Sequence, residues 1–409
     1  MMRLLTTLIF LVAAALPGAA LAEGHLVIVG GGLKAENAAV YRAFLDARPA
    51  GTPRIVIIPA ASGEASASAE AARDALVKHG ASVADIAIAQ IAMKDDPGTR
   101  TVDESRWARN VDSEEELARL ENAGAIWFTG GDQSRITGLL LTKAGDDTPY
   151  LSAIRARYAE GAVIGGTSAG AAIMSGAMIT QGDSMGALLP GDAGEDVGLA
   201  RGLHFLRNNL IDQHFGERAR LGRLAVALIR LKKALPIGLG IDENTALVVA
   251  PGQRSATILG AGYVTVLNAA QATASPGEHA RITGLVVGLA GNGDEIDLTD
   301  GSVKPAWYRK DTKGREYFER AATPGGGMAV PGTMLADVIG EALMDNAEAD
   351  EVVRYSFSGD LGVAYRFGQT DASRAAWGRD EDGKAAYSIS GVRFDIEPIS
   401  VSIQPIEDK

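Results

Sequence analysis

The sequence of 409 residues contains no cysteine. Disulfide bonds, thiolate metal sites and a cysteine nucleophile are therefore excluded. Any covalent catalysis by this chain must use another side chain, such as a serine hydroxyl. Stability must come from a buried core, and a hydrophobic fraction of 46% is sufficient for one.

Positive charge is also scarce, since 39 basic residues face 51 acidic residues and give a formal net charge of −12. Non-specific nucleic-acid binding requires a positively charged surface, so we expect no nucleic-acid partner. An anionic membrane surface would repel the chain for the same reason. Neutral and cationic ligands remain open.

Long apolar runs are missing except near the N-terminus. Arg3 is followed by the apolar stretch 4–16, and a cleavage site of the A-x-A type ends at Ala22. The sequence therefore predicts a signal peptide over residues 1–22, cleaved after Ala22, and a periplasmic or secreted protein without membrane contact. An uncleaved anchor is the less favoured alternative, because roughly 20 apolar residues are needed to span a bilayer.

Glycine, by contrast, is abundant, with 50 residues that cluster behind short apolar runs. Runs that are apolar on both faces and stop near glycine or proline are typical of strands buried in a parallel sheet. They lie at 25–29, 54–58, 125–129 and 161–164, with helical patterns at 34–47, 64–79, 113–122 and 149–159. This alternation predicts an α/β fold with a doubly wound, mostly parallel sheet, whose ligand site lies at the carboxyl ends of the strands.

The rest of the chain continues the pattern and then changes. A helical pattern covers 215–234, and strand patterns follow at 245–250, 255–260 and 262–267. We place the end of the catalytic core near residue 305, which predicts a core over 23–305 and an extension over 306–409. The extension contains alternating segments such as 385–394, so we expect it to be smaller and partly β, without a role that can be inferred from its residues.

One glycine-rich strand end carries a nucleophile candidate. Residues 166–170 read Gly-Thr-Ser-Ala-Gly, a G-x-S-x-G elbow between a predicted strand and a helix of small residues. Such a sharp turn lifts the hydroxyl of Ser168 from the sheet edge and aims the N–H of Ala169 at a developing oxyanion. The alternative is a glycine-rich turn in which the serine is incidental.

A second glycine-rich segment favours no cofactor. Gly30-x-Gly32-x-x-Ala35 fits a loose dinucleotide pattern, but the acidic residue expected at the end of the second strand is absent. No phosphate-binding loop of the Walker type is present. We therefore expect neither an organic cofactor nor a metal.

A serine nucleophile needs a general base, usually histidine, that is oriented by a carboxylate. Of the five histidines, His214 stands in the polar cluster 211–223, whereas His25 and His79 have positions typical of structural residues. The acid is less determined, with candidates at Asp132, Asp183, Asp212, Asp242 and Glu243. Asp242 and Glu243 both follow a short apolar run, and the residues alone do not decide between them.

Four motifs together resemble one family. They read FTGGDQ at 128–133, GGTSAGA at 165–171, DQHFGERARLGR at 212–223 and GIDENTA at 240–246. Their order and spacing are similar to those of the cyanophycinase branch of the aspartyl-dipeptidase family, over roughly residues 25–305. The resemblance implies a flavodoxin-like or class I glutamine amidotransferase-like fold.

The resemblance also implies roles for individual residues. Ser168, His214 and Glu243 would form the triad, with backbone N–H groups of Ala169 and Gly131 in the oxyanion hole. Substrate-binding residues would be Gln133, Asp212, Gln213, Arg218 and Arg223. Arg218 and Arg223 can pair with substrate carboxylates, and Asp212 can face a guanidinium group.

The family's substrate is cyanophycin, a poly-aspartate backbone that carries arginine on each side chain and is cleaved to β-Asp-Arg dipeptides. An exported enzyme would act on polymer released by other cells. Family members often dimerise, so a homodimer is an expectation that comes from the resemblance alone.

Three other interpretations remain at this point. The enzyme can be an exported peptidase for other aspartyl or isoaspartyl peptides. It can be an α/β-hydrolase esterase with the order serine, acid, histidine, in which His279 is the base. It can also be a peptide-binding protein that has lost catalysis.

Overall fold

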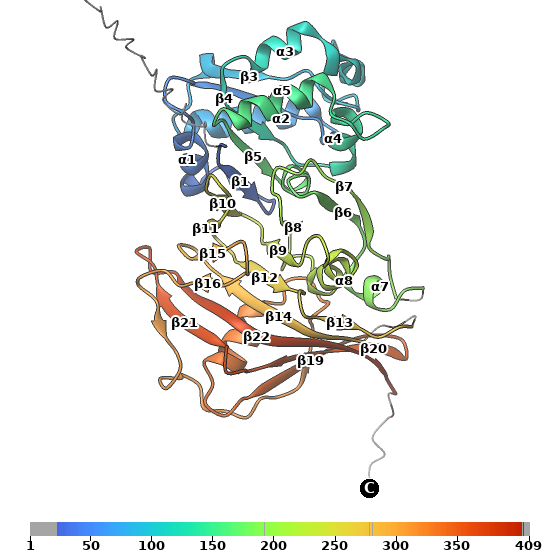
Figure 1. Cartoon of the computed structure of the whole chain (residues 1–409), viewed down its shortest axis with the longest axis vertical. Coiled ribbons are helices and arrows are strands. Elements are labelled where there is room, and N and C mark those ends of the chain that lie inside the picture. The colour runs from blue at the N-terminus through green and yellow to red at the C-terminus, as the bar shows by residue number, and fades with distance from the viewer. Residues whose placement is uncertain (1–22, 192, 278, 280, 403, 405–409) are drawn as a thin grey trace, which may run out of the picture.

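The computed structural model describes residues 23–191, 193–277, 279, 281–402 and 404. The predicted signal peptide, residues 1–22, lies outside these described residues. In the part of the chain that the structure describes, the helices are too short or too polar to cross a membrane. Figure 1 shows one sheet with helices on both faces above a second sheet that contains the C-terminal strands.

The first sheet has nine strands among the described residues. Five of them, β1, β5, β4, β2 and β3, run parallel, and β10, β11, β15 and β16 continue the sheet antiparallel beyond β1. In order across the sheet they are β16 (Val303–Lys304), β15 (Glu295–Asp297), β11 (Ser255–Gly260), β10 (Thr245–Val249), β1 (Leu26–Val29), β5 (Val163–Thr167), β4 (Ala123–Phe128), β2 (Arg54–Ile58) and β3 (Ile86–Ile88).

Helices cover both faces of the parallel strands because successive strand residues point to opposite sides. In β1, Leu26 and Ile28 pack into one core cluster, whereas Val27 and Val29 pack into another. The first cluster includes side chains of α3 (Glu114–Leu120), α4 (Gln133–Leu140) and α5 (Pro149–Ala159), and the second includes those of α1 (Ala38–Asp46) and α2 (Ala65–Lys78). The prediction of a doubly wound, parallel-rich sheet is confirmed.

Two predicted helices begin later than their patterns, and each difference has a physical reason. The first starts at Ala38 rather than at 34, because Asn37 caps it by accepting a hydrogen bond from the N–H of Val40. The helix α8 (Leu221–Leu231) starts after 215, because Ala219 has a φ of 50° and the turn that contains it is not helical. In both cases the displaced residues belong to loops at the carboxyl ends of strands.

The second sheet has eleven strands in the described part of the chain. It begins with β8 (Asn209–Gln213), parallel to β9 (Ile237–Ile241), and continues through β12 (Val264–Asn268), β14 (Ile282–Ala290), β22 (Ala385–Ser400), β20 (Leu361–Gly368), β19 (Glu351–Ser358) and β18 (Gly325–Gly326), with β13 (Thr273–Ala274), β17 (Lys310–Asp311) and β21 (Arg374–Arg379) beside this path. The remaining elements are the hairpin of β6 (Ala177–Gln181) and β7 (Gly198–Arg201), the helices α6 (Ala169–Ala172) and α7 (Ser184–Leu188), the 3₁₀-helices η1 (Val83–Asp85) and η2 (Glu104–Asp112) and the π-helix η3 (Ala336–Met344).

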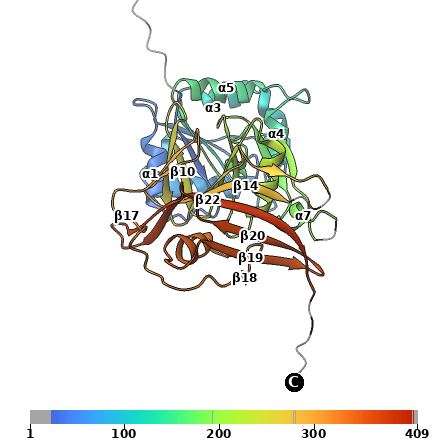
Figure 2. The same cartoon turned by 60° about the horizontal axis from the view of Figure 1, so that its bottom comes forward.

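The extension after residue 305 is built into this second sheet. Its long strand β22 pairs with β14 of the core, so strands from both sides of the expected boundary share this sheet. Leu285 on β14 and Phe394 on β22 are partners in register, and both are buried. Arg309 of the extension also forms a fully buried ion pair with Asp294 of the core. Figure 2 shows the C-terminal strands as a curved layer beneath the rest of the molecule.

The two sheets meet where the predicted catalytic residues lie. The first sheet ends its strand β5 directly before Ser168, and the second sheet ends its strands β8 and β9 directly before His214 and near Glu243. The short link from β9 to β10 passes from one sheet to the other. The relative position of the two sheets therefore determines the distance between serine and histidine.

Candidate active site

Ser168 stands in a strained turn between β5 and α6. Its φ is 54° and its ψ is −109°, a conformation that costs a residue with a side chain of order 1–3 kcal/mol. Glycine is required at positions 166 and 170, on either side of Ser168, because neighbouring backbone atoms leave no room for a Cβ atom there. A Cβ at Gly166 would lie 2.4 Å from the carbonyl oxygen of Gly170, and a Cβ at Gly170 would lie 2.5 Å from that of Phe128. The turn thus has the geometry of a nucleophile elbow.

The predicted base and acid lie beside this serine. The Oγ of Ser168 is 2.8 Å from Nε2 of His214, and Nδ1 of His214 is 2.5 Å from Oε1 of Glu243. Because the carboxylate can only accept, Nδ1 carries a hydrogen in this arrangement, and Nε2 is left to accept the serine proton. The three side chains form one continuous hydrogen-bonded chain in the order serine, histidine, acid.

The two adjacent acids point in different directions. Glu243 turns towards His214, whereas Asp242 turns away and accepts hydrogen bonds from the N–H groups of Gly216 and Tyr263, both at 2.9 Å. Burial raises the pKa of Asp242 to about 6, and the charge of Glu217 acts in the same direction. Asp242 therefore holds the turn that follows His214 and does not contact the imidazole ring.

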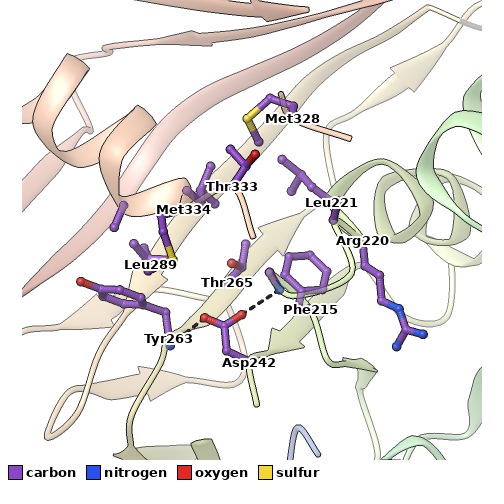
Figure 3. Close-up of a pocket in the computed structure, with 14 residues that line it drawn as sticks. Phe215, Arg220, Leu221, Asp242, Tyr263, Thr265, Leu289, Met328, Thr333 and Met334 are labelled. Carbon is purple, nitrogen blue, oxygen red and sulfur yellow. Dashed lines mark hydrogen bonds between the residues drawn. The ribbon is translucent and has the colours of Figure 1, made fainter. Parts of the chain in front are cut away.

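Figure 3 shows Asp242 at the wall of a pocket between this turn and the extension. Phe215 lines it from the turn, and Met328 and Met334 line it from the extension. The N–H of Gly332 also donates a hydrogen bond to the carbonyl of Gly216 at 3.2 Å. The extension therefore packs against the back of the turn that carries the predicted base.

The glycine loop after β1 packs against the same histidine, a role that the sequence analysis missed. The backbone N–H of His214 donates to the carbonyl of Gly30 at 2.6 Å. Gly31 has a φ of +106°, and a Cβ there would lie 2.2 Å from Cε1 of the imidazole. The consecutive glycines thus leave room for the histidine ring, and their place at a strand end beside β5 was the available signal.

The electrostatics of the site favour a neutral histidine. Burial lowers the pKa of His214 below its ordinary value. The hydrogen bond that His214 donates to Glu243 opposes this effect, while the positive charges of Arg218 and Arg220 add to it. A neutral imidazole at neutral pH is the form that can accept a proton from Ser168.

Two backbone N–H groups are available beside the serine. A Cβ at Gly130 would lie 3.3 Å from Cβ of Ser168, so the Gly130–Gly131 turn packs against Ser168. The N–H groups of Gly131 and Ala169 donate to no other group among the described residues. Both N–H groups are therefore free to donate to a bound group, and the oxyanion hole stays a prediction.

Comparison with known proteins agrees with this geometry. Residues 26–256 match the family model described as peptidase family S51. The chain belongs to this family. A cyanophycinase from Nostoc sp. is 31% identical over 300 residues, which cover 69% of this chain and 88% of that protein. A cyanophycinase from Synechococcus elongatus is 41% identical over 177 residues, but this match covers 42% of this chain and only 51% of that relative, about half its length.

Among solved structures, a crystal structure of a peptidase from an acI-B1 Actinobacterium aligns with 68% of this chain and 98% of its own. The sequence identity is 19% and the TM-score is 0.48. This distant likeness adds nothing to what the family match and the cyanophycinase relatives already give.

Two of the pocket residues expected in this S51 chain bind each other instead of facing outward. Nε of Arg223 lies 2.8 Å from Oδ2 of Asp212, and their side chains are only 5% and 1% exposed. Burial opposes ionisation of Asp212, but Arg223 and Arg220 outweigh it and hold the pKa of Asp212 below its ordinary value. The expectation that both charges face substrate is thus corrected: the pair is an internal ion pair under the site.

The other expected pocket residues differ in their availability. Arg218 is exposed on the turn after His214. Gln213 is buried, and its Oε1 has no hydrogen-bond partner among the described residues. Gln133 is also buried, and its side-chain amide donates to the carbonyl of Ile179 at 2.7 Å. Arg218 and Gln213 therefore have free polar atoms near the triad, whereas the amide of Gln133 already connects α4 to β6.

The remaining histidines take no part in this arrangement. His79 stacks on Tyr41 and bonds to the carbonyl of Ala35 at 2.8 Å. His279, the base in the esterase interpretation, lies between β13 and β14, while the hydroxyl of Ser168 contacts His214. Within the described ranges, there is also no group of three or more His, Asp or Glu side chains that could hold a metal ion.

Proposed function

We propose that this chain is a serine peptidase that hydrolyses cyanophycin to β-Asp-Arg dipeptides, with Ser168, His214 and Glu243 as its triad. The observation that carries the proposal is the hydrogen-bonded chain of these three side chains on a strained elbow. Membership of family S51 and the cyanophycinase relatives support the substrate class. The alternatives of an esterase and of an inactive binding protein have no such supporting contact.

The proposed reaction has two halves. His214 takes the proton of Ser168 through Nε2 as the serine oxygen attacks the substrate carbonyl, and Glu243 stabilises the imidazolium that forms. The N–H groups of Ala169 and Gly131 hold the tetrahedral oxyanion. The carbon–nitrogen bond then breaks, the amine leaves with the proton from His214, and an acyl-enzyme remains. Water attacks this ester with His214 again acting as base, which releases the acid and restores Ser168.

Two charge features support a substrate that carries both carboxylates and guanidinium groups. The exposed side chain of Arg218 lies close to His214 and can pair with the free α-carboxylate of an arginine that the polymer carries. The net charge of −12 attracts the cationic arginines of the polymer. Export through the predicted signal peptide, and hence action on polymer outside the cell, remains part of the proposal.

The test is incubation of residues 23–409 with cyanophycin, followed by mass spectrometry of the soluble products. Wild-type protein should release β-Asp-Arg, and Ser168→Ala should retain less than about one thousandth of the rate, the loss usual for a triad nucleophile. If neither protein releases the dipeptide, the cyanophycin assignment fails, and isoaspartyl peptides become the next substrates to assay. If Ser168→Ala remains active, the covalent mechanism fails.

A further inference from the structure

The extension exposes large aromatic side chains in a chain that has few of them. Aromatic residues make up 5% of the sequence. Among the described residues, the exposed fraction is 87% for Trp307, 83% for Tyr317 and 38% for Trp377. These three belong to one region of the extension, where Tyr317 and Trp377 line a single cleft and Trp307 contacts the ring of Tyr308 at its wall. Exposed aromatic groups gathered at one cleft mark a binding surface.

The cleft has the size of a ligand site. Its volume is about 920 Å³, within the range of pockets that bind small molecules or peptide segments. It is formed by β17, β21, the start of β22 and the helix η3, and Figure 2 shows β17 at the outer edge of this layer. The aromatic residues that line it are Tyr308, Tyr317, Phe318, Trp377 and Tyr387.

Carboxylates accompany these rings. Asp311, Glu341 and Asp345 line the cleft, and so do the basic residues Lys310, Arg315 and Arg379. Asp311 forms no ion pair within the described part of the chain, and Glu341 has only a long contact of 3.9 Å with the exposed Arg320. A planar cation that stacks on an aromatic face while it pairs with a carboxylate satisfies both groups, and guanidinium is the side chain that does both.

The chain's own arginines already use the rings of this region in that way. The guanidinium carbon of Arg320 lies 4.5 Å from the ring centre of Phe318, and that of Arg379 lies 5.6 Å from the ring centre of Trp377. In the described structure no arginine lies over Tyr317, which is the most exposed ring of the lining. The cleft therefore retains a free aromatic face in surroundings where guanidinium groups stack.

The turn between β21 and β22 separates the cleft from a second groove. This groove is about 300 Å³, and its lining includes Asn244, which follows the triad acid, together with Asp380 and Lys384 of the β21–β22 turn. The cleft is lined by Arg379 and Ala385, the neighbours of those two turn residues. Nζ of Lys384 also donates to the carbonyl of Ala261, which fixes the turn against the core. A long ligand in the cleft can thus continue past this turn into the groove that contains Asn244.

We propose that the aromatic cleft of the extension is an accessory site that holds guanidinium side chains of the polymeric substrate away from the triad. This inference rests on the proposed function, because it assigns the cleft to a part of the same polymer. It gives the extension a role that a short peptide substrate would not require.

The test measures binding of the Ser168→Ala protein, residues 23–409, to insoluble cyanophycin by sedimentation, so that cleavage does not interfere. Adding Tyr317→Ala or Trp377→Ala should raise the apparent Kd about three- to tenfold, the loss expected when one cation–π contact is removed. Adding Phe357→Ala is the matched control, because Phe357 is 57% exposed on β19 and lies outside the cleft lining. This control should leave the Kd unchanged.

Competition identifies the group that is recognised. Soluble poly-L-arginine should displace the protein from the polymer, and poly-L-aspartate should not. Equal binding of the cleft variants and the Phe357→Ala control, or displacement by poly-L-aspartate alone, would overturn the accessory site. Dipeptide release by the wild type in the separate cleavage assay would still leave the proposed function intact in that case. Binding that depends on the cleft, without dipeptide release by the wild type, would support the cleft as a binding site and contradict the proposed function.

Discussion

At the scale of residues, two neighbouring acids divide two tasks by the direction in which they point. Glu243 contacts the imidazole of His214, and Asp242 accepts two backbone N–H groups behind it. The sequence leaves this choice open because both residues follow β9 directly, and the backbone of the turn decides which side chain faces the site. Asn244 has a φ of 53° in that turn, which no apolar pattern indicates.

A pH profile tests the electrostatics of the base. In the proposed mechanism His214 must be neutral, so kcat/KM should rise with pH. The acid limb should lie below the ordinary histidine pKa of about 6.5 because burial lowers the pKa of His214. Arg218 also lowers this pKa through its positive charge. Arg218→Gln removes that charge, so the acid limb should move to higher pH by about half a unit.

The control for this profile is Arg218→Lys, which keeps the charge and should leave the limb in place. An acid limb above 6.5 in the wild type, or a limb that does not respond to Arg218→Gln, would contradict the assignment of His214 as the base.

At the scale of elements, the buried strands and their helices are predictable because each is a local pattern. The predicted apolar strands coincide with β1, β2, β4 and β5 within a few residues. The predicted helices coincide with α1, α2, α3 and α5 to the same precision. The second sheet is not predictable in this way, since β22 pairs with β14 across roughly one hundred residues and no local pattern records the pairing. The buried ion pair of Asp212 and Arg223 is also not predictable from sequence, because a charged residue type does not show whether its side chain faces the substrate or the interior.

The glycine loop after β1 gives a prediction at this scale. Gly31→Ala places a methyl group against the imidazole of His214, so it should displace the base and lower kcat/KM by about a hundredfold. Gly80→Ala is the matched control, because Gly80 has a φ of +108° and a Cβ there would meet nothing within 4 Å. The two variants share the backbone strain, and only the first reaches the base. Equal activity of the two would contradict the role of the loop.

At the scale of the whole molecule, core and extension share one sheet and one buried ion pair. Arg309 and Asp294 are 1% and 0% exposed, so Arg309→Met leaves a buried carboxylate without its partner. Urea unfolding should show a loss of about 3–5 kcal/mol. Arg393→Met is the control, because Arg393 pairs with Glu351 at the surface, and it should cost about 1 kcal/mol or less. Similar losses for both would contradict the interpretation of the Arg309 pair as a contact that joins core and extension.

The homodimer expected from the family stays a prediction.

The central claim is that Ser168 is a nucleophile activated by His214, and covalent labelling tests it without any assumption about substrate. A fluorophosphonate reacts with an activated serine, and peptide mass spectrometry locates the modified residue. The account predicts one phosphonyl group on Ser168 in the wild type and none in His214→Ala. Labelling of another residue, or equal labelling of Ser168 when His214 is absent, would contradict it.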